Sequence, residues 1–149
     1  MTKILFICHG SICRSPMARF IFQNEIDKLG LHDKYIVDAK AVSREEIGND
    51  MYPPAKRCLD KHNIPYVKTS SSQVTRSDYD YYDYLIIMDE HNRYLLERIV
   101  GNDKDKKVYT LLSFAGLQSD ISDPWYTGDF EECYKDIVKG VNGLLTKIL

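Results

Sequence analysis

The chain has 149 residues, of which 44% are hydrophobic and 28% are charged, and its formal net charge is −2. The length fits a single domain over residues 1–149, and the composition is that of a folded soluble protein rather than a disordered one. The slight acidic excess argues against nucleic acid as a partner, because nucleic-acid-binding domains usually carry a basic excess. No apolar run is long enough to cross a membrane, so we expect no membrane insertion.

The chain has four cysteines and four histidines. The cysteines indicate the cellular compartment, and the histidines indicate whether a metal is bound. The apolar run at residues 4–7 is too short for a signal-peptide core, and no small-residue cleavage site follows it. We therefore expect a cytoplasmic protein whose cysteines are free thiols. The histidines show no metal-ligand spacing, so we expect no metal and no other cofactor. We also expect the protein to act as a monomer.

Four runs have the pattern of strands. Residues 4–8 are continuously apolar, as is typical of a strand buried on both faces, and residues 35–41, 84–88 and 108–112 follow along the chain. Helical patterns separate these runs. The predicted helices are residues 18–29 before Gly30, a segment beginning at Pro53-Pro54, a segment beginning at Thr75-x-x-Asp78, residues 90–99 capped by Asp89, and residues 130–148 after a capping-box pattern at Asp129 and Glu132.

This alternation of strands and helices predicts a three-layer α/β fold, in which helices flank both faces of a four-stranded parallel sheet. In such folds the site lies at the carboxyl ends of the strands. The segments to inspect are therefore those that follow residues 7, 88 and 112.

The segment after the first strand carries the strongest chemical signal. It reads Cys8-His9-Gly10-Ser11-Ile12-Cys13-Arg14-Ser15-Pro16. Cys8 and Arg14 are spaced as Cys-x5-Arg and fill a turn between a buried strand and a helix whose first turn contains Pro16. Cys13 and Arg19 have the same spacing by accident, because that stretch runs into the helix and leaves no loop.

A short loop before a helix N-terminus directs backbone N–H groups inward and, with the helix dipole, forms an anion site. Arg14 is expected to add a bidentate fork to two phosphate oxygens. The same field favours the thiolate form of Cys8, which makes that residue a nucleophile facing a bound phosphorus atom. Gly10 is expected to adopt a backbone angle that a side chain would resist.

Breaking the bond between phosphorus and a poor leaving group also requires an acid that protonates the departing oxygen. The loop after the fourth predicted strand contains Asp123-Pro124-Trp125-Tyr126. Asp123 is the candidate acid, Pro124 stiffens the loop, and the two aromatic residues are candidates for the walls of a cleft.

On these two motifs, and over nearly its full length, the chain resembles the low-molecular-weight protein tyrosine phosphatases. The family loop, Cys-x-Gly-Asn-x-Cys-Arg-Ser-Pro, is matched at Cys8, Gly10, Cys13, Arg14, Ser15 and Pro16, and the family's Asp-Pro-aromatic-aromatic motif is matched at residues 123–126. The resemblance implies a flavodoxin-like fold with a four-stranded parallel sheet. It also implies phosphotyrosine proteins as substrates, and phosphate and other oxyanions as inhibitors.

The resemblance further implies roles for individual residues. Cys8 forms a cysteinyl-phosphate, Asp123 acts first as acid and then as base, Ser15 stabilises the thiolate, and no metal is needed. The residues that would hold the phosphoryl oxygens are His9, Gly10, Ser11, Ile12, Cys13 and Arg14. Those expected along the substrate cleft are Ile12, Glu45, Trp125 and Tyr126.

Two departures from the family pattern bear on the substrate and the loop. Ser11 stands where the family has an Asn that braces the loop, and residues 43–48 lack the aromatic that usually grips the substrate ring. Glu45 and Glu46 lie in that segment, which predicts a preference for substrates with basic flanks.

Three alternatives use the same loop. An arginine phosphatase has Thr where this chain has Ile12, and an arsenate reductase needs a further cysteine pair near the third strand, whereas no cysteine lies between Cys58 and Cys133. A non-catalytic phosphate-binding module is expected to have lost Cys8, Arg14 or Asp123. Within the favoured reading, the neighbouring thiols of Cys8 and Cys13 predict a reversible disulfide under peroxide.

Overall fold

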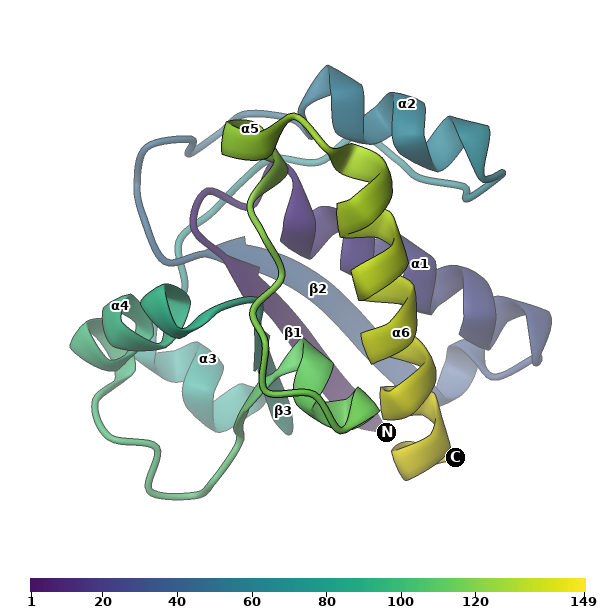
Figure 1. Ribbon diagram of the computed structural model, residues 1–149. Helices are drawn as coiled ribbons and strands as arrows, with labels where there is room; N and C mark the ends of the chain where they lie inside the picture. The colour runs from purple at the N-terminus through teal and green to yellow at the C-terminus, as the bar shows by residue number, and fades with distance from the viewer.

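The computed structural model describes all 149 residues and contains one four-stranded parallel sheet (Figure 1). Its strands are β1 (Thr2–Cys8), β2 (Tyr35–Ala41), β3 (Tyr84–Ile87) and β4 (Val108–Thr110), in the order β2-β1-β3-β4. β1 is central and pairs with β2 on one side and with β3 on the other, all in parallel register. The predicted fold class is confirmed.

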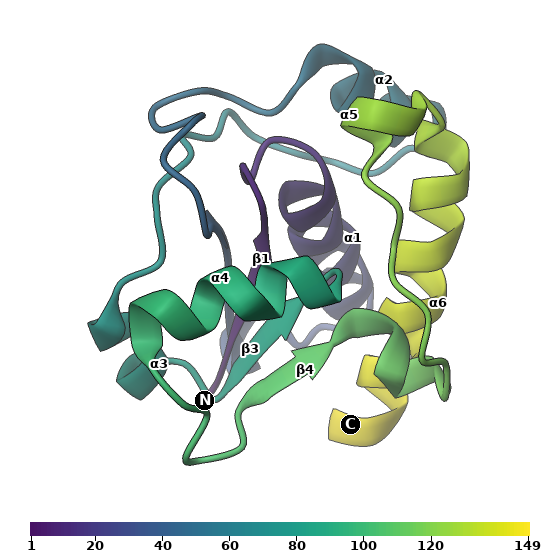
Figure 2. The ribbon, with the colours of Figure 1, turned by 60° about the vertical axis from the view of Figure 1, so that its left-hand side comes forward.

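Helices cover both faces of the sheet, as the two views show (Figures 1 and 2). They are α1 (Arg14–Lys28), α2 (Pro53–Lys61), α3 (Arg76–Tyr81), α4 (Glu90–Val100), α5 (Pro124–Thr127) and α6 (Phe130–Ile148). Two short 3₁₀ helices span His32–Lys34 and Leu111–Ala115. The predicted caps form: Thr75 and Asp89 make full capping boxes, and Asp129 accepts the N–H of Glu132.

The alternation of side chains along β1 divides the core into two layers. Ile4, Phe6 and Cys8 face the larger layer, which contains the apolar faces of α1, α2 and α6. Leu5 and Ile7 face the smaller layer under α3 and α4. Burial on both faces explains why this strand is continuously apolar and why it anchors the loop that follows.

The fourth strand is shorter than predicted, because it ends at Thr110 and Leu111 begins a 3₁₀ helix. This short helix packs tightly against α6: a Cβ added at Gly140 would lie 2.4 Å from the Leu111 side chain, and one at Gly143 would lie 2.2 Å from the Phe114 carbonyl oxygen. Close packing on α6 therefore turns the chain away from the sheet. The pattern of apolar residues did not show this change of direction.

The segment expected to be a loop around Asp123 contains the one-turn helix α5. In Figure 1, α5, the start of α2 and the carboxyl end of β1 lie towards the same end of the molecule. The segments that carry the two sequence motifs are therefore near one another. None of the helices combines the length and the apolar character needed to cross a membrane.

Candidate active site

The loop from Cys8 to Arg14 joins the buried end of β1 to the first turn of α1. Its left-handed residue is Ser11, at φ 55°, whereas Gly10 has no positive φ, so the backbone role expected of Gly10 is wrong. Space at position 10 is tight, because an added Cβ would lie 3.1 Å from Glu46 Cγ and that side chain would have to shift by a few tenths of an ångström. Ser71 braces the same point by donating its hydroxyl to the Gly10 carbonyl at 2.7 Å.

Cys8 lies at the base of the loop, buried and surrounded by donors. Its Sγ accepts the N–H of Ser11 at 3.3 Å and that of Ser15 at 3.4 Å. The thiol lies 3.2 Å from Ser15 Oγ, which in turn lies 2.8 Å from Ser11 Oγ. When the thiol is ionised, Ser15 must supply the proton of that first bond, so the two hydroxyls form a relay that stabilises a thiolate.

The remaining loop amides are available to a ligand. The N–H groups of Gly10, Ile12, Cys13 and Arg14 donate to no acceptor within the protein. They belong to a turn that ends in the N-terminus of the 15-residue helix α1, where the helix dipole favours an anion. The loop therefore has the backbone donors that the sequence predicted for a phosphoryl group.

Arg14 is held next to this loop by three acceptors, although its side chain is only 2% exposed. One terminal nitrogen donates to Asp89 Oδ2 at 2.6 Å and to the Ile121 carbonyl at 2.8 Å, and the other donates to Asp123 Oδ2 at 3.4 Å. Burial opposes the charge on Arg14, yet Cys8 and the two carboxylates keep its pKa above the ordinary value. Arg14 therefore stays charged.

Asp89 has a role that the sequence did not reveal. It follows β3 closely, at the edge of the sheet where the sequence predicts a site, but its own sequence pattern indicates only a helix cap. In the structure one oxygen caps α4 by accepting the Asn92 N–H at 2.7 Å, while the other accepts from Arg14. Asp89 thus ties the Arg14 guanidinium to the start of α4.

Asp89→Asn is expected to lower kcat/KM by about ten- to hundredfold, because it weakens a buried charge-assisted hydrogen bond to Arg14. Asn is also a good N-cap, so Tm should change little. The matched control is Asp129→Asn, which changes the same kind of cap on α6 without touching Arg14. Steady-state kinetics with an aryl phosphate check this, and equal effects of the two substitutions would contradict it.

Asp123 is the N-cap of α5: Oδ1 accepts the Trp125 N–H at 3.1 Å, while Oδ2 faces Arg14. Trp125 and Tyr126 follow, 49% and 81% exposed. The Trp125 ring packs 4.7 Å from that of Tyr52, whose backbone N–H donates to the Ile12 carbonyl at 2.8 Å. The sequence did not predict a place for Tyr52 at the site. Residues 43–48 lack an aromatic side chain, and Tyr52 supplies one next to the loop.

At the outer edge of the loop, His9 and Glu45 contact each other. His9 Nε2 lies 3.0 Å from a carboxylate oxygen of Glu45, which is 71% exposed. The His9 and His91 rings stack with their centroids 6.0 Å apart. Glu46 turns its side chain towards Gly10 and accepts from Asn49. Of the two glutamates expected at the edge, Glu45 is therefore the more exposed to an approaching ligand.

All four cysteines are free, as expected, and all are buried. Burial raises the pKa of the Cys13 thiol, and Cys8 raises it further. Burial likewise raises the pKa of the Cys133 thiol. Both therefore remain protonated at neutral pH.

Together the fold and the loop define an α/β protein that can hold a tetrahedral oxyanion against a cysteine at the carboxyl edge of a parallel sheet. A family model for low molecular weight phosphotyrosine protein phosphatase matches residues 3–149. The chain therefore belongs to this family.

Relatives from distant organisms agree with this assignment. Low molecular weight protein-tyrosine-phosphatase YfkJ of Bacillus subtilis is 35% identical over 99% of this chain and 96% of its own, and its crystal structure has a TM-score of 0.93, covering 99% of this chain and 94% of that one. The low molecular weight phosphotyrosine protein phosphatase of Gallus gallus is 35% identical over 97% and 94% of the two chains. The crystal structure of SP-PTP, a low molecular weight protein tyrosine phosphatase from Streptococcus pyogenes, is 33% identical, with a TM-score of 0.89 over 100% and 94%.

Proposed function

We propose that this protein hydrolyses phosphotyrosine in proteins, and small aryl phosphates, through a cysteinyl-phosphate on Cys8. The observation that carries the proposal is the placement of the Cys8 thiol, which accepts the N–H groups of Ser11 and Ser15, in a loop with further unpaired amides and close to the charged side chain of Arg14. The family assignment supports the same reaction class.

In the first step the loop amides and Arg14 hold the phosphoryl oxygens, so that phosphorus faces Cys8 Sγ. The thiolate attacks, an S–P bond forms and the P–O bond to the tyrosine ring breaks. Asp123 gives its proton to the departing phenolate oxygen. A bound phosphoryl group competes with Asp123 for Arg14, and this competition frees the carboxyl for the transfer.

In the second step Asp123, now ionised, takes a proton from water, and the water oxygen attacks phosphorus. The S–P bond breaks, its electrons return to Cys8 as thiolate, and phosphate leaves. Ser15 and Ser11 are positioned to stabilise that thiolate. Because phosphate occupies the same donors as substrate, it and other oxyanions are expected to inhibit competitively.

The substrate class is tested by comparing purified enzyme on phosphotyrosine, phosphoarginine and arsenate. Turnover of phosphotyrosine with the highest kcat/KM supports the proposal. A preference for phosphoarginine would replace it with the arginine phosphatase alternative, and thiol-dependent reduction of arsenate would replace it with the reductase. Binding of phosphate without any turnover would identify a non-catalytic module.

The edge charges predict a flank preference. Because Glu45 is exposed beside the loop, phosphotyrosine peptides with basic flanks should be cleaved roughly two- to fivefold better than acidic ones at low salt, the range of a single exposed ion pair. Glu45→Lys should reverse the ranking, whereas Glu97→Lys, on the exposed face of α4, should not. Peptide kinetics at two salt concentrations measure this, and an unchanged ranking in Glu45→Lys would remove Glu45 from the substrate path.

We also propose redox control within the loop. Peroxide oxidises the Cys8 thiolate to sulfenic acid, which then condenses with the Cys13 thiol to a disulfide and releases water. Inactivation should be slowed by bound phosphate and reversed by dithiothreitol. In Cys13→Ser the inactivation should become largely irreversible. Cys133→Ser, which removes a different buried thiol, should still recover its activity. Mass spectrometry that finds Cys8 linked to Cys133 or Cys58 would contradict this pairing.

A cytoplasmic location and a monomeric state complete the proposal. Four free, buried thiols are typical of a reducing compartment.

A further inference from the structure

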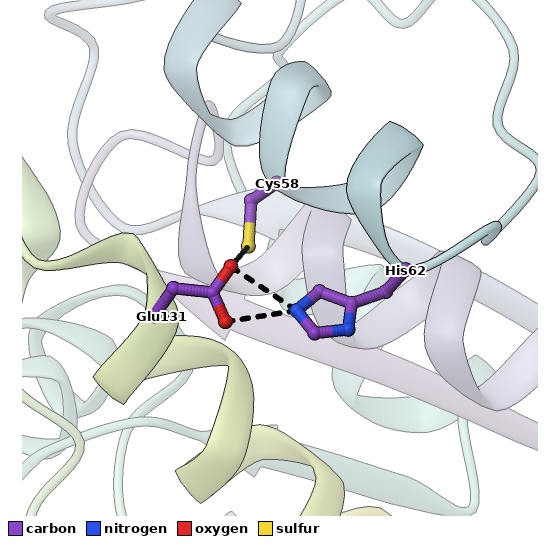
Figure 3. Close-up of side chains that lie close together, drawn as sticks. All are labelled: Cys58, His62 and Glu131. Atoms are coloured by element: carbon purple, nitrogen blue, oxygen red, sulfur yellow. Dashed lines mark hydrogen bonds and ion pairs between the residues drawn. The ribbon is translucent and has the colours of Figure 1, made fainter.

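A second cluster of reactive side chains lies between α2 and α6, apart from the phosphate-binding loop (Figure 3). Cys58 and His62 are one turn apart at the end of α2, and Glu131 lies in the first turn of α6. Their ligand atoms, one sulfur, one imidazole nitrogen and one carboxylate oxygen, all lie within 4.8 Å of one another. The reaction proposed above uses none of the three.

The geometry of the cluster is fixed from several sides. His62 stacks on the Tyr134 ring, with centroids 3.7 Å apart and planes 7° from parallel. This stacking directs Nε2 to the two Glu131 oxygens, at 2.8 and 3.1 Å. Cys58 Sγ lies 3.7 Å from Glu131 Oε1, the oxygen that is 3.1 Å from His62, and 3.6 Å from the Phe130 carbonyl oxygen.

The cluster is buried on its sulfur side and open on the other. Cys58 is 6% exposed, whereas the side chains of His62 and Glu131 are 28% and 37% exposed. The nearest cation is Lys61, whose Nζ lies 3.4 Å from a Glu131 oxygen and whose side chain is 67% exposed. A solvent ion therefore has a route to all three ligand atoms, and Lys61 can move into water to make room.

We propose that Cys58, His62 and Glu131 bind a zinc ion, with water as the fourth ligand. Thiolate, imidazole and carboxylate are the ligand types that zinc takes in proteins, at about 2.0–2.3 Å from the metal. Small side-chain rotations bring the three atoms to those distances, and the ion replaces the His62–Glu131 hydrogen bond. Cys58 releases its proton to solvent on binding, so the thiolate and the carboxylate together neutralise the ion.

The consequence of binding is mechanical. The ion joins the end of α2 to the start of α6, and the residues next to this junction lead to the Asp123 segment: Phe130 packs 6.2 Å from Tyr52, and Tyr52 packs 4.7 Å from Trp125. The zinc-bound chain should therefore be more stable to unfolding. This inference does not depend on the proposed phosphatase reaction.

The test is titration with Co²⁺, a coloured substitute for zinc, in full-length Cys8→Ser protein, which removes the competing active-site thiolate. We expect one ion per chain, a sulfur-to-cobalt charge-transfer band and release of one proton. Adding Cys58→Ser should abolish that band. His62→Gln and Glu131→Gln should each weaken binding by about tenfold or more. Cys13→Ser, which removes a different buried thiol, is the matched control and should leave the titration unchanged.

Thermal unfolding distinguishes a variant that has lost metal binding from one that folds poorly. In the Cys8→Ser protein, zinc at a hundredfold excess over its Kd should raise Tm by about 5–10 °C, and the gain should fall to about half or less in His62→Gln, whose metal-free Tm reports its folding. Absence of Co²⁺ binding, or binding that survives Cys58→Ser, would overturn the proposal. So would a band that is lost in Cys13→Ser and kept in Cys58→Ser.

Discussion

Cys8→Ser is expected to reduce phosphatase turnover below detection, while Cys13→Ser retains substantial activity. Both residues are buried thiols of the same loop, and both substitutions exchange sulfur for oxygen. Only Cys8 receives two backbone N–H groups and lies next to Ser15. A serine hydroxyl in that place is not ionised at neutral pH and is therefore a poor nucleophile.

Phosphate binding keeps this comparison interpretable, because Cys8→Ser should still bind substrate and phosphate through Arg14 and the loop amides. Such a variant holds its substrate without turning it over and can capture phosphoproteins. Equal loss of activity in the two variants would show that Cys8 is not the only nucleophile. Loss of phosphate binding in Cys8→Ser would show that the loop itself had changed.

Asp123→Asn is expected to lower kcat/KM by roughly 10²–10⁴-fold on substrates with poor leaving groups, because the general acid of the first step is gone. The loss should shrink for p-nitrophenyl phosphate, whose leaving group needs little protonation. Asn preserves the side-chain oxygen that caps α5 at the Trp125 N–H, so the segment should keep its shape.

A series of aryl phosphates with graded leaving groups measures this dependence. Asp123 also contacts Arg14, so the inhibition constant of phosphate should be determined in the same variant. Leaving-group dependence with nearly unchanged phosphate inhibition supports the acid role. A uniform loss across the series would mean that Asp123 only positions the loop or the guanidinium.

The sequence predicted the sheet and most helices well, because the physical signals were local. The continuously apolar run of β1, the capping boxes at Thr75 and Asp89, and the stripe of α6 each depend on residues close together in the chain. The turn at Leu111 depends on Gly140 and Gly143 of α6, some 30 residues away, and no local pattern reports such packing.

In the candidate site, too, the sequence predicted features that depend on neighbouring residues and missed contacts between distant segments. Cys8, Arg14 and Asp123 were selected from short motifs, whereas the Arg14–Asp89 ion pair and the packing of Tyr52 on Trp125 join distant segments. The expectation for Gly10 was wrong because spacing cannot tell which loop residue takes the left-handed conformation. The structure gives that conformation to Ser11, whose short side chain then reaches Ser15.

The intermediate itself provides the most direct test of the central claim. Asp123→Asn lacks the base that activates water, so its phosphoenzyme should persist long enough to be trapped by rapid quenching with p-nitrophenyl phosphate, whose leaving group needs little protonation and therefore still allows the first step. We predict a single phosphoryl group, located by peptide mass spectrometry on Cys8. Phosphate found on His9 or another residue, or turnover with no phosphoenzyme under conditions where release is slow, would contradict the account.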